Sequence, residues 1–502
     1  MSAIRKNLIS LLVSQVATWG VSLVILVRVP GYLGDETFGV LNFATYYMAF
    51  FALLAGMGTP TLLTREIARD HSLVGRYVSN VVVLKLVLIA VLSVAAVGLA
   101  VLLGYEGTVL VLIVVGCFGM LFSEINGDLV AALGGMERMA KSSALGVVQV
   151  YVGSIGGLAV LAAGGGVIAY GLVLVAAMII PLAANSMLVW PYVRGSLGLD
   201  RQVWRFLVRG GLPLLVLAAF NLIYGTVDIP LLDLIAGSAA VGWYALAYRW
   251  VGIPIFMSTA VVAAFFPRFS ALGKVRSPEF PVQVNRAIRF TSLAAVPAAV
   301  GLGVVADPLL SFFYKNEDFG NSIVLMQILA IHIPVAAVDT IMAMSLIAID
   351  RQRKYVLVAG CAAVLNPIAC VIAIHITMDR YDNGAIGAAI VTVGTEMLIL
   401  AAALTIRPHG VMDGWTAWTC GRIVGAGLVM GAVVLAAGDQ PLAVQVAIGV
   451  VVYAVASLAF RTVTIGDVRR VLHQVGNGVG SIVRRGRSSP GPSGDAEPPA
   501  EG

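Results

Sequence analysis

The sequence has few charged residues for its length. Asp, Glu, Lys and Arg make up 12% of its 502 residues, whereas hydrophobic residues make up 59%. A water-soluble protein of this size needs more polar surface than this composition supplies. Apolar runs of about 20 residues recur almost without a pause, and each is long enough to cross a bilayer as a helix. The composition predicts an all-α polytopic membrane protein, and the net charge of +6 is not taken as a nucleic-acid footprint.

Several chemical signatures are missing. The four cysteines form no CxxC pair and lie within or beside apolar runs, which argues against a zinc site or a disulfide framework. Gly273 and Lys274 form the only Gly-Lys pair, but Arg268 stands where a phosphate-binding loop requires glycine. HExxH is absent too, and the predicted outer loops are short and carry no acid–base constellation. We therefore expect no cofactor and no enzyme activity, so a membrane glycosyltransferase, polymerase or ligase is disfavoured.

Hydropathy divides the chain into about fourteen candidate transmembrane helices. Nothing in these runs alternates as a membrane β-strand would. The approximate limits of the spans are 7–27, 37–57, 79–103, 108–132, 142–163, 167–190, 211–233, 240–266, 288–312, 321–348, 355–376, 384–406, 417–437 and 441–460.

The positions of the basic residues test this count. With the N-terminus inside, nearly all Lys and Arg residues fall on segments that are predicted to be cytoplasmic. The predicted outer side holds only Arg28, Lys315 and Arg380. This asymmetry follows the positive-inside rule along the whole chain. It predicts a multi-pass protein of the cell (inner or plasma) membrane with both termini in the cytoplasm.

One stretch of sequence occurs twice. Residues 234–249 read LIAGSAAVGWYALAYR, and residues 31–46, which lie 203 positions earlier, read GYLGDETFGVLNFATY. Glycines match at two positions, Gly34 with Gly237 and Gly39 with Gly242. The position of the two copies divides the apolar part of the chain into similar halves, which indicates an internal duplication.

The number of spans in each half sets their relative orientation. Six spans precede the basic connector 194–210, and six follow it, so both halves enter the membrane from the same side and are parallel repeats. We expect an N-terminal six-helix lobe at 1–200 and a C-terminal six-helix lobe at 201–406. Residues 407–460 add transmembrane helices 13 and 14, and residues 461–502 form a basic cytoplasmic tail that is partly disordered.

Five stretches then resemble a known family. They are TREIAR at 64–69, FFPRFSAL at 265–272, ADPLLSFFYKNEDF at 306–319, AIDRQRKYVLVAGCAAVLNPIACVIAI at 348–374 and DNGAIGAAIVTVGTE at 382–396. In their order and spacing they resemble the polysaccharide-biosynthesis flippases of the multidrug/oligosaccharidyl-lipid/polysaccharide (MOP) exporter superfamily. The resemblance covers roughly residues 5–406. It implies two lobes around a central cavity, alternating access, and a polyprenyl-diphosphate-linked glycan as substrate.

Three cations are candidate substrate-binding residues, because a diphosphate headgroup that crosses a low-dielectric cavity needs positive charge along its path. Arg249 lies about ten residues inside its span, where a charge is costly. An ion pair with Asp228 or Asp233 is the structural alternative for Arg249. Arg28 and Lys85 lie nearer to the ends of their spans, and the alternative for both is snorkelling to the interface.

Two sets of polar residues are candidates for ion or proton coupling. Glu124 and Asp128 are four residues apart on one helix face, and they form either a relay or ion pairs with Lys85 or Arg138. Asp228, Asn366 and Thr392 supply the hard oxygen ligands that small cations prefer. Some relatives, notably lipid II flippases, have a sodium site between the corresponding helices. Here Cys370 stands where a further oxygen ligand is expected. Glu396 and His332 are isolated polar residues without such a pattern.

The leading hypothesis is a secondary transporter that flips a lipid-linked oligosaccharide from the inner to the outer leaflet. Its partners would be that glycolipid, membrane lipids, and the glycan polymerase and glycosyltransferases of the same pathway, with no nucleic acid. A lipid II flippase and a cation-coupled drug exporter are the alternatives within transport. A structural membrane scaffold would leave the buried Arg249 unexplained.

Overall fold

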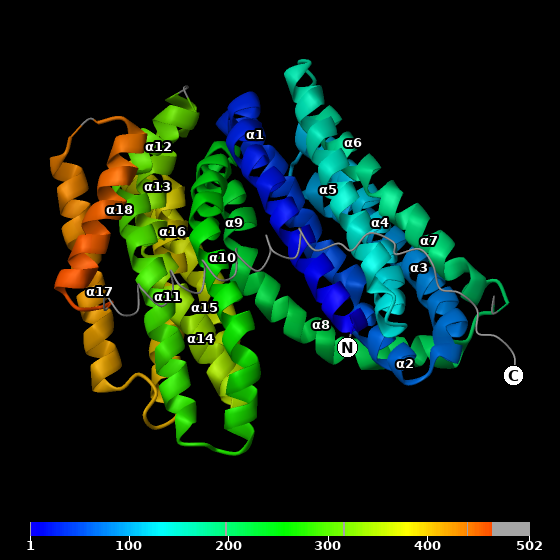
Figure 1. The fold of residues 1–502 in the computed structure, drawn as a ribbon. Coiled ribbons are helices and arrows are strands. Elements are labelled where there is room, and N and C mark those ends of the chain that lie inside the picture. The colour runs from blue at the N-terminus through cyan, green and yellow to red at the C-terminus, as the bar shows by residue number, and fades with distance from the viewer. Residues whose placement is uncertain (1, 196–197, 315–316, 439, 464–502) are drawn as a thin grey trace, which may run out of the picture.

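The computed structural model describes residues 2–195, 198–314, 317–438 and 440–463. These residues form α-helices and two short 3-10 helices, η1 (His71–Leu73) and η2 (Glu317–Phe319), and they contain no strand (Figure 1). Lys315 and most of the predicted tail lie outside the described residues. The α-helices are α1 (Ser2–Gly56), α2 (Thr59–Arg69), α3 (Val74–Leu102), α4 (Gly107–Gly135), α5 (Met139–Ala162), α6 (Val167–Ala177), α7 (Ile179–Val193), α8 (Arg201–Thr226), α9 (Asp228–Ala236), α10 (Ser238–Lys274), α11 (Glu279–Val304), α12 (Ala306–Phe313), α13 (Gly320–Ala330), α14 (His332–Ala348), α15 (Gln352–Tyr381), α16 (Gly384–Thr405), α17 (Gly414–Ala436) and α18 (Leu442–Ala459).

The all-α polytopic fold is confirmed. Within the described residues, 13 helical segments are long and apolar enough to cross a membrane. One of them, 23–69, has 47 residues and contains the end of the first predicted span together with the whole second span. These two spans belong to α1, which Gly34 interrupts with φ 72° and ψ 173°. The difference between 13 segments and fourteen predicted spans therefore lies in α1.

The two glycines of the repeated stretch have the same backbone conformation. Gly237 separates α9 from α10 with φ 81° and ψ 172°, which closely matches the break at Gly34. An L-residue with a side chain rarely adopts this region, so glycine is needed at both breaks. The sequence repeat thus corresponds to a repeated structural feature, and we call the side of the molecule that carries both breaks the Gly34 end.

The two copies of the repeat pack against each other reciprocally. A Cβ atom on Gly39 would lie 1.7 Å from the carbonyl oxygen of Ser238, and one on Gly242 would lie 2.1 Å from that of Asp35. Asp35 and Ser238 are themselves 203 positions apart. The same two positions therefore meet with their roles exchanged, as they do across a two-fold axis. Only glycine lets α1 and α10 approach this closely.

The buried apolar residues are shared between the halves at one end only. The largest core cluster joins Phe38 and Phe43 of α1 to Val241 of α10 and Leu325 of α13. Farther from the Gly34 end, α2, α3, α4, α7 and α8 share one separate cluster, while α10, α11, α14 and α16 contribute to another. The halves are thus joined at the Gly34 end and have separate cores at the opposite end, where α2 lies far from the α10–α11 connection in Figure 1.

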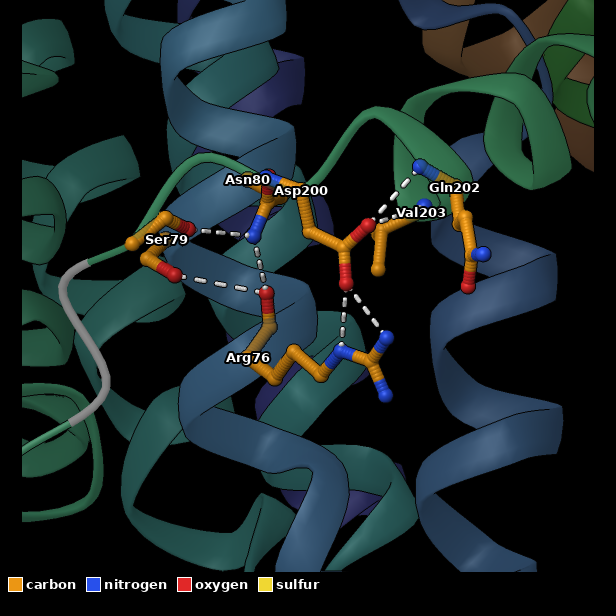
Figure 2. A network of polar contacts seen from close by, with 7 residues as sticks. Arg76, Ser79, Asn80, Asp200, Gln202 and Val203 are labelled. Carbon is orange, nitrogen blue, oxygen red and sulfur yellow. Dashed lines mark hydrogen bonds and ion pairs between the residues drawn. The ribbon is translucent and has the colours of Figure 1, made fainter.

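The connector between the halves is fastened to α3. Figure 2 shows Asp200 between Arg76 and the first turn of α8. Arg76 Nε donates to Asp200 Oδ2 at 3.0 Å, and Asp200 Oδ1 caps α8 by accepting from the Gln202 backbone N–H at 2.8 Å. Asn80 accepts from the Asp200 backbone N–H at 2.7 Å and donates to the Gly198 carbonyl at 2.9 Å.

The connector also continues directly into a long helix. The basic segment that sequence suggested as an interfacial helix forms the first part of α8, which then continues to Thr226. Its Val203 and Leu207 are buried in the cluster of the first half, and a Cβ on Gly211 would lie 2.0 Å from the Met57 carbonyl oxygen. The first turns of α8 therefore pack on the N-terminal half. The domain boundary between 200 and 201 stays a prediction.

Candidate functional site

Arg249 lies on α10, close to the contact between the two halves. It is twelve residues beyond Gly237, which places it about 18 Å from the Gly34 end along a helix with a 1.5 Å rise. Its Nη2 donates to Asn42 Oδ1 of α1 at 2.9 Å. Its Cζ lies 4.9 Å from the centroid of the Phe38 ring, in a cation–π contact. Asn42 is itself fixed by donating to the Phe38 carbonyl at 2.6 Å.

No carboxylate balances the charge of Arg249 among the described residues. The ion pair with Asp228 or Asp233 that sequence left open is not formed, because both acids bind hydroxyl groups instead. Asp228 accepts from Tyr244, and Asp233 accepts from Tyr105 and Ser238, each at 2.7 Å. The described surroundings of Arg249 are thus an amide, an aromatic ring and nearby tyrosines, and the guanidinium keeps its full positive charge for an anion.

Arg28 is exposed and lines a cavity of about 520 Å³ at the Gly34 end. Tyr32 of α1 and the aromatic residues Phe312, Tyr314 and Phe319 line the same cavity. Arg28 and Arg249 therefore lie at different depths beside the same seam between the halves. The structure does not bring them together in one pocket.

Lys85 is only 1% exposed, and it lies between two acids of α4 rather than at the interface. Its Nζ is 2.9 Å from Glu124 Oε2 and 2.9 Å from Asp128 Oδ2. Thr59, at the start of α2, donates to Asp128 Oδ1 at 2.8 Å. The ion pairs that sequence allowed as an alternative are therefore present, and they connect α2, α3 and α4. This cluster carries one positive and two negative groups.

The other coupling candidates do meet. Asp228, Asn366 and Thr392, from α9, α15 and α16, line one cavity of about 200 Å³ in the C-terminal half. Tyr244 donates to Asp228, and its hydroxyl lies 3.0 Å from that of Thr392. Asn366 donates to Thr395 at 3.1 Å, and its Oδ1 lies 3.7 Å from Cys370 Sγ. The cavity offers several oxygen atoms to a small cation.

Some residues of this cavity were not found from the sequence. Glu396 and His332 line it, Tyr224 donates to Glu396, and the buried Nδ1 of His332 has no hydrogen-bond partner among the described residues. Asn42, which holds Arg249, was also missed. The repeat gives a signal for Asn42, because it lies inside the first copy and packs against the second. A tyrosine or glutamate in an apolar run gives no such signal.

Two family profiles match the sequence. The family described as "Polysaccharide biosynthesis protein" matches residues 4–272, and the family described as "Lipid II flippase MurJ" matches residues 143–439. No curated protein matches.

Two solved structures show the fold. "Lipid II flippase MurJ, inward closed conformation" is similar with a TM-score of 0.71 and 15% identity, over 91% of this chain and 98% of that chain. "Inward-facing conformation of a multidrug resistance MATE family transporter of the MOP superfamily" gives a TM-score of 0.59 and 19% identity, over 80% and 94%. At these identities the likeness establishes the fold alone.

Proposed function

Because this chain belongs to the polysaccharide-biosynthesis and lipid II flippase family of the MOP superfamily, we propose that it flips a polyprenyl-diphosphate-linked oligosaccharide from the inner to the outer leaflet. The observation that carries the proposal is Arg249, whose charge has no carboxylate partner among the described residues. A purely structural arginine at this depth would need a compensating acid. A diphosphate is the anion whose geometry suits the guanidinium fork.

Arg249 has donors to spare for such a headgroup. A guanidinium carries five N–H donors, and Asn42 is the only described residue that accepts from it. The Phe38 ring supports the cation without neutralising it. A bound diphosphate would thus gain charge-assisted hydrogen bonds, which offset part of its lost hydration.

The arrangement of the cores supports alternating access. The halves share one apolar core at the Gly34 end and have separate cores at the opposite end, which sequence predicts to be cytoplasmic. A headgroup entering from that side would reach Arg249 before the closed Gly34 end. Transport would then require the Gly39 and Gly242 contacts to separate while the opposite end closes.

The membrane potential favours this direction of movement. A cell interior that is negative drives an anion outward by about 2.3 kcal/mol per charge per 100 mV, and a doubly charged headgroup gains roughly twice that. After release, the uncompensated Arg249 would favour the return of the empty carrier, provided that this charge moves through the field.

We assign ion coupling to the cavity of Asp228, Asn366 and Thr392. Its oxygen-rich lining suits a sodium ion, although Cys370 supplies sulfur where a further oxygen would bind more strongly. The Lys85, Glu124 and Asp128 cluster is a second candidate, for a proton, because its two carboxylates outnumber its one cation. Since Lys85 is engaged by both acids, it fits the coupling cluster better than the substrate path.

Lipid II is the second candidate substrate. It carries the same polyprenyl-diphosphate group, and the lipid II flippase profile covers much of the C-terminal half. Drug export fits less well, since most exported drugs would not need an uncompensated arginine. In either flippase role the protein would work in the plasma membrane, with both termini cytoplasmic, beside the glycosyltransferases and polymerase of its pathway.

The substrate can be tested in proteoliposomes. Purified protein would be reconstituted with a fluorescent polyprenyl-diphosphate oligosaccharide, with lipid II, or with a cationic drug, and appearance in the other leaflet would be measured by dithionite quenching or uptake. We expect flipping of the oligosaccharide lipid. Flipping of lipid II alone would select the second candidate, and drug transport without lipid movement would contradict both.

A further inference from the structure

The membrane-facing surface between α8 and α15 contains a groove of about 640 Å³ that plays no part in the proposed transport path. Phe220 of α8 forms one wall, and α15 forms the other. The α15 residues are Arg353, Val356, Leu357, Gly360, Cys361, Val364 and Leu365. All but one of them are apolar or neutral, and Arg353 lies at one end. The groove is therefore amphipathic along its length.

The dimensions of the groove match one leaflet of a bilayer. Arg353 and Leu365 are twelve residues apart on one helix, a rise of about 18 Å. Half of a typical hydrocarbon core is about 15 Å thick. Arg353 is the second residue of α15, which has 30 residues and is long enough to span the bilayer. The charged end of the groove thus lies at the interface, and the apolar part extends toward the bilayer centre.

The interfacial end is basic. Residues 350–354 contain one acid, Asp350, and three cations, Arg351, Arg353 and Lys354. Arg351 donates to the Ile406 carbonyl at 3.2 Å. Arg353 and Lys354 are exposed and form no ion pair among the described residues. Basic groups beside a groove between transmembrane helices are the arrangement that retains anionic lipid headgroups.

The middle of the groove has room for a hydrocarbon chain. A Cβ atom on Gly360 would meet no other atom within 4 Å. Around it, Leu357 is 70% exposed, Val364 60% and Leu365 59%. A single acyl chain laid over Gly360 would cover these side chains while its phosphate reached Arg353 and Lys354.

We propose that this groove binds a glycerophospholipid with an anionic headgroup, with its phosphate at Arg353 and Lys354 and one acyl chain over Gly360. The one-leaflet length favours a bilayer phospholipid over the much longer polyprenyl chain of the transport substrate. The proposal does not depend on which lipid the protein flips. The bound lipid would touch both α8, whose first turns pack on the N-terminal half, and α15, which carries Asn366.

Cys361 provides a reporter, because it is exposed in the groove while the other cysteines are buried or half-buried. A bimane label on Cys361 would be quenched by brominated lipid in full-length protein in nanodiscs, and Cys361→Ala protein should take up no label. We expect brominated phosphatidylglycerol to quench more than brominated phosphatidylcholine at equal mole fraction. The preference should be roughly fivefold in affinity per cation and about twenty-five-fold for both. Equal quenching by the two lipids would overturn the proposal.

Variants separate the charged end from the apolar part. Arg353→Gln with Lys354→Gln should abolish the preference while both lipids still quench. Arg380→Gln, at the other end of α15, is the matched control and should keep the preference. Gly360→Phe, which has space for its ring, should weaken quenching by both lipids. A preference that survives the double substitution, or displacement of brominated phosphatidylglycerol by equimolar polyprenyl phosphate, would contradict the assignment.

Discussion

Replacing Gly242 with alanine should weaken the contact that holds the two halves together at the Gly34 end. The added Cβ would lie 2.1 Å from the carbonyl oxygen of Asp35, which is backbone and cannot rotate away. Carbon and oxygen reach ordinary contact at roughly 3.3 Å, so α1 and α10 would have to separate by about 1 Å. Overpacking of this kind costs about 1–3 kcal/mol.

A second alanine variant isolates this clash from helix propensity. Alanine in a helix interior is favoured over glycine by about 1 kcal/mol, and this gain opposes the clash. Gly252 lies on the same helix, and a Cβ there would meet nothing within 4 Å. Gly252→Ala therefore carries the propensity gain alone. The difference between the two variants should be the clash itself, or roughly 5- to 150-fold in the equilibrium for opening the Gly34 end.

Amide hydrogen exchange measures this opening directly. Segments 35–46 and 238–249 should exchange faster in Gly242→Ala than in Gly252→Ala, by that factor, while the separate core of α2, α3 and α4 stays unchanged. Gly39→Ala should give the same result, because its Cβ would lie 1.7 Å from the Ser238 carbonyl oxygen. Equal exchange in the Gly242 and Gly252 variants would refute the idea that this contact closes the Gly34 end.

Three further substitutions test the polar clusters. Asp228→Ala should abolish a sodium-dependent rise in the melting temperature of the purified protein, and a wild-type protein that does not respond to sodium would remove the cation site. Lys85→Met should reduce stability by about 3–5 kcal/mol because it strands buried carboxylates, and adding Asp128→Asn should recover part of the loss in a thermal-melt assay. The hydrogen bonds from Arg76 hold the pKa of Asp200 below its ordinary value, so the fastening of the connector should persist at neutral pH and be lost as pH falls through that lowered pKa. Arg76→Gln should move this loss to higher pH, as measured by proteolysis of the connector, and an unchanged profile would argue against the ion pair.

The sequence predicted the fold well because hydropathy and charge act locally along a membrane protein. Alternation of the basic segments set the span count, and the repeat at Gly34 and Gly237 indicated a duplication whose copies then proved to contact each other. The number of separate helices differed only where Gly34 interrupts α1. Hydropathy cannot report such a break, because it arises from the backbone angles of one residue.

The site was less predictable, because its contacts join residues far apart in the chain. Asp228, Asn366 and Thr392 were grouped correctly by ligand chemistry, but the Tyr244 hydroxyl that links two of them looks like an apolar packing residue in sequence. For Arg249, charge alone suggested an acid on the preceding span, whereas its partner is the neutral amide of Asn42 on the other copy of the repeat. Neutral partners leave no signal in charge patterning.

Flipping by Arg249 variants tests the central claim most directly. Purified wild-type, Arg249→Ala and Arg249→Lys proteins would be reconstituted with a fluorescent polyprenyl-diphosphate oligosaccharide, and the flipping rate would be measured with the amount of folded protein matched. Because Arg249 has no described acid to strand, Arg249→Ala should fold and insert normally. It should flip the lipid roughly 10- to 150-fold more slowly, which corresponds to the loss of about 1.5–3 kcal/mol of charge-assisted hydrogen bonding. Arg249→Lys should recover part of the rate, since it keeps the charge but loses the fork. Wild-type flipping by well-folded Arg249→Ala protein would contradict the account.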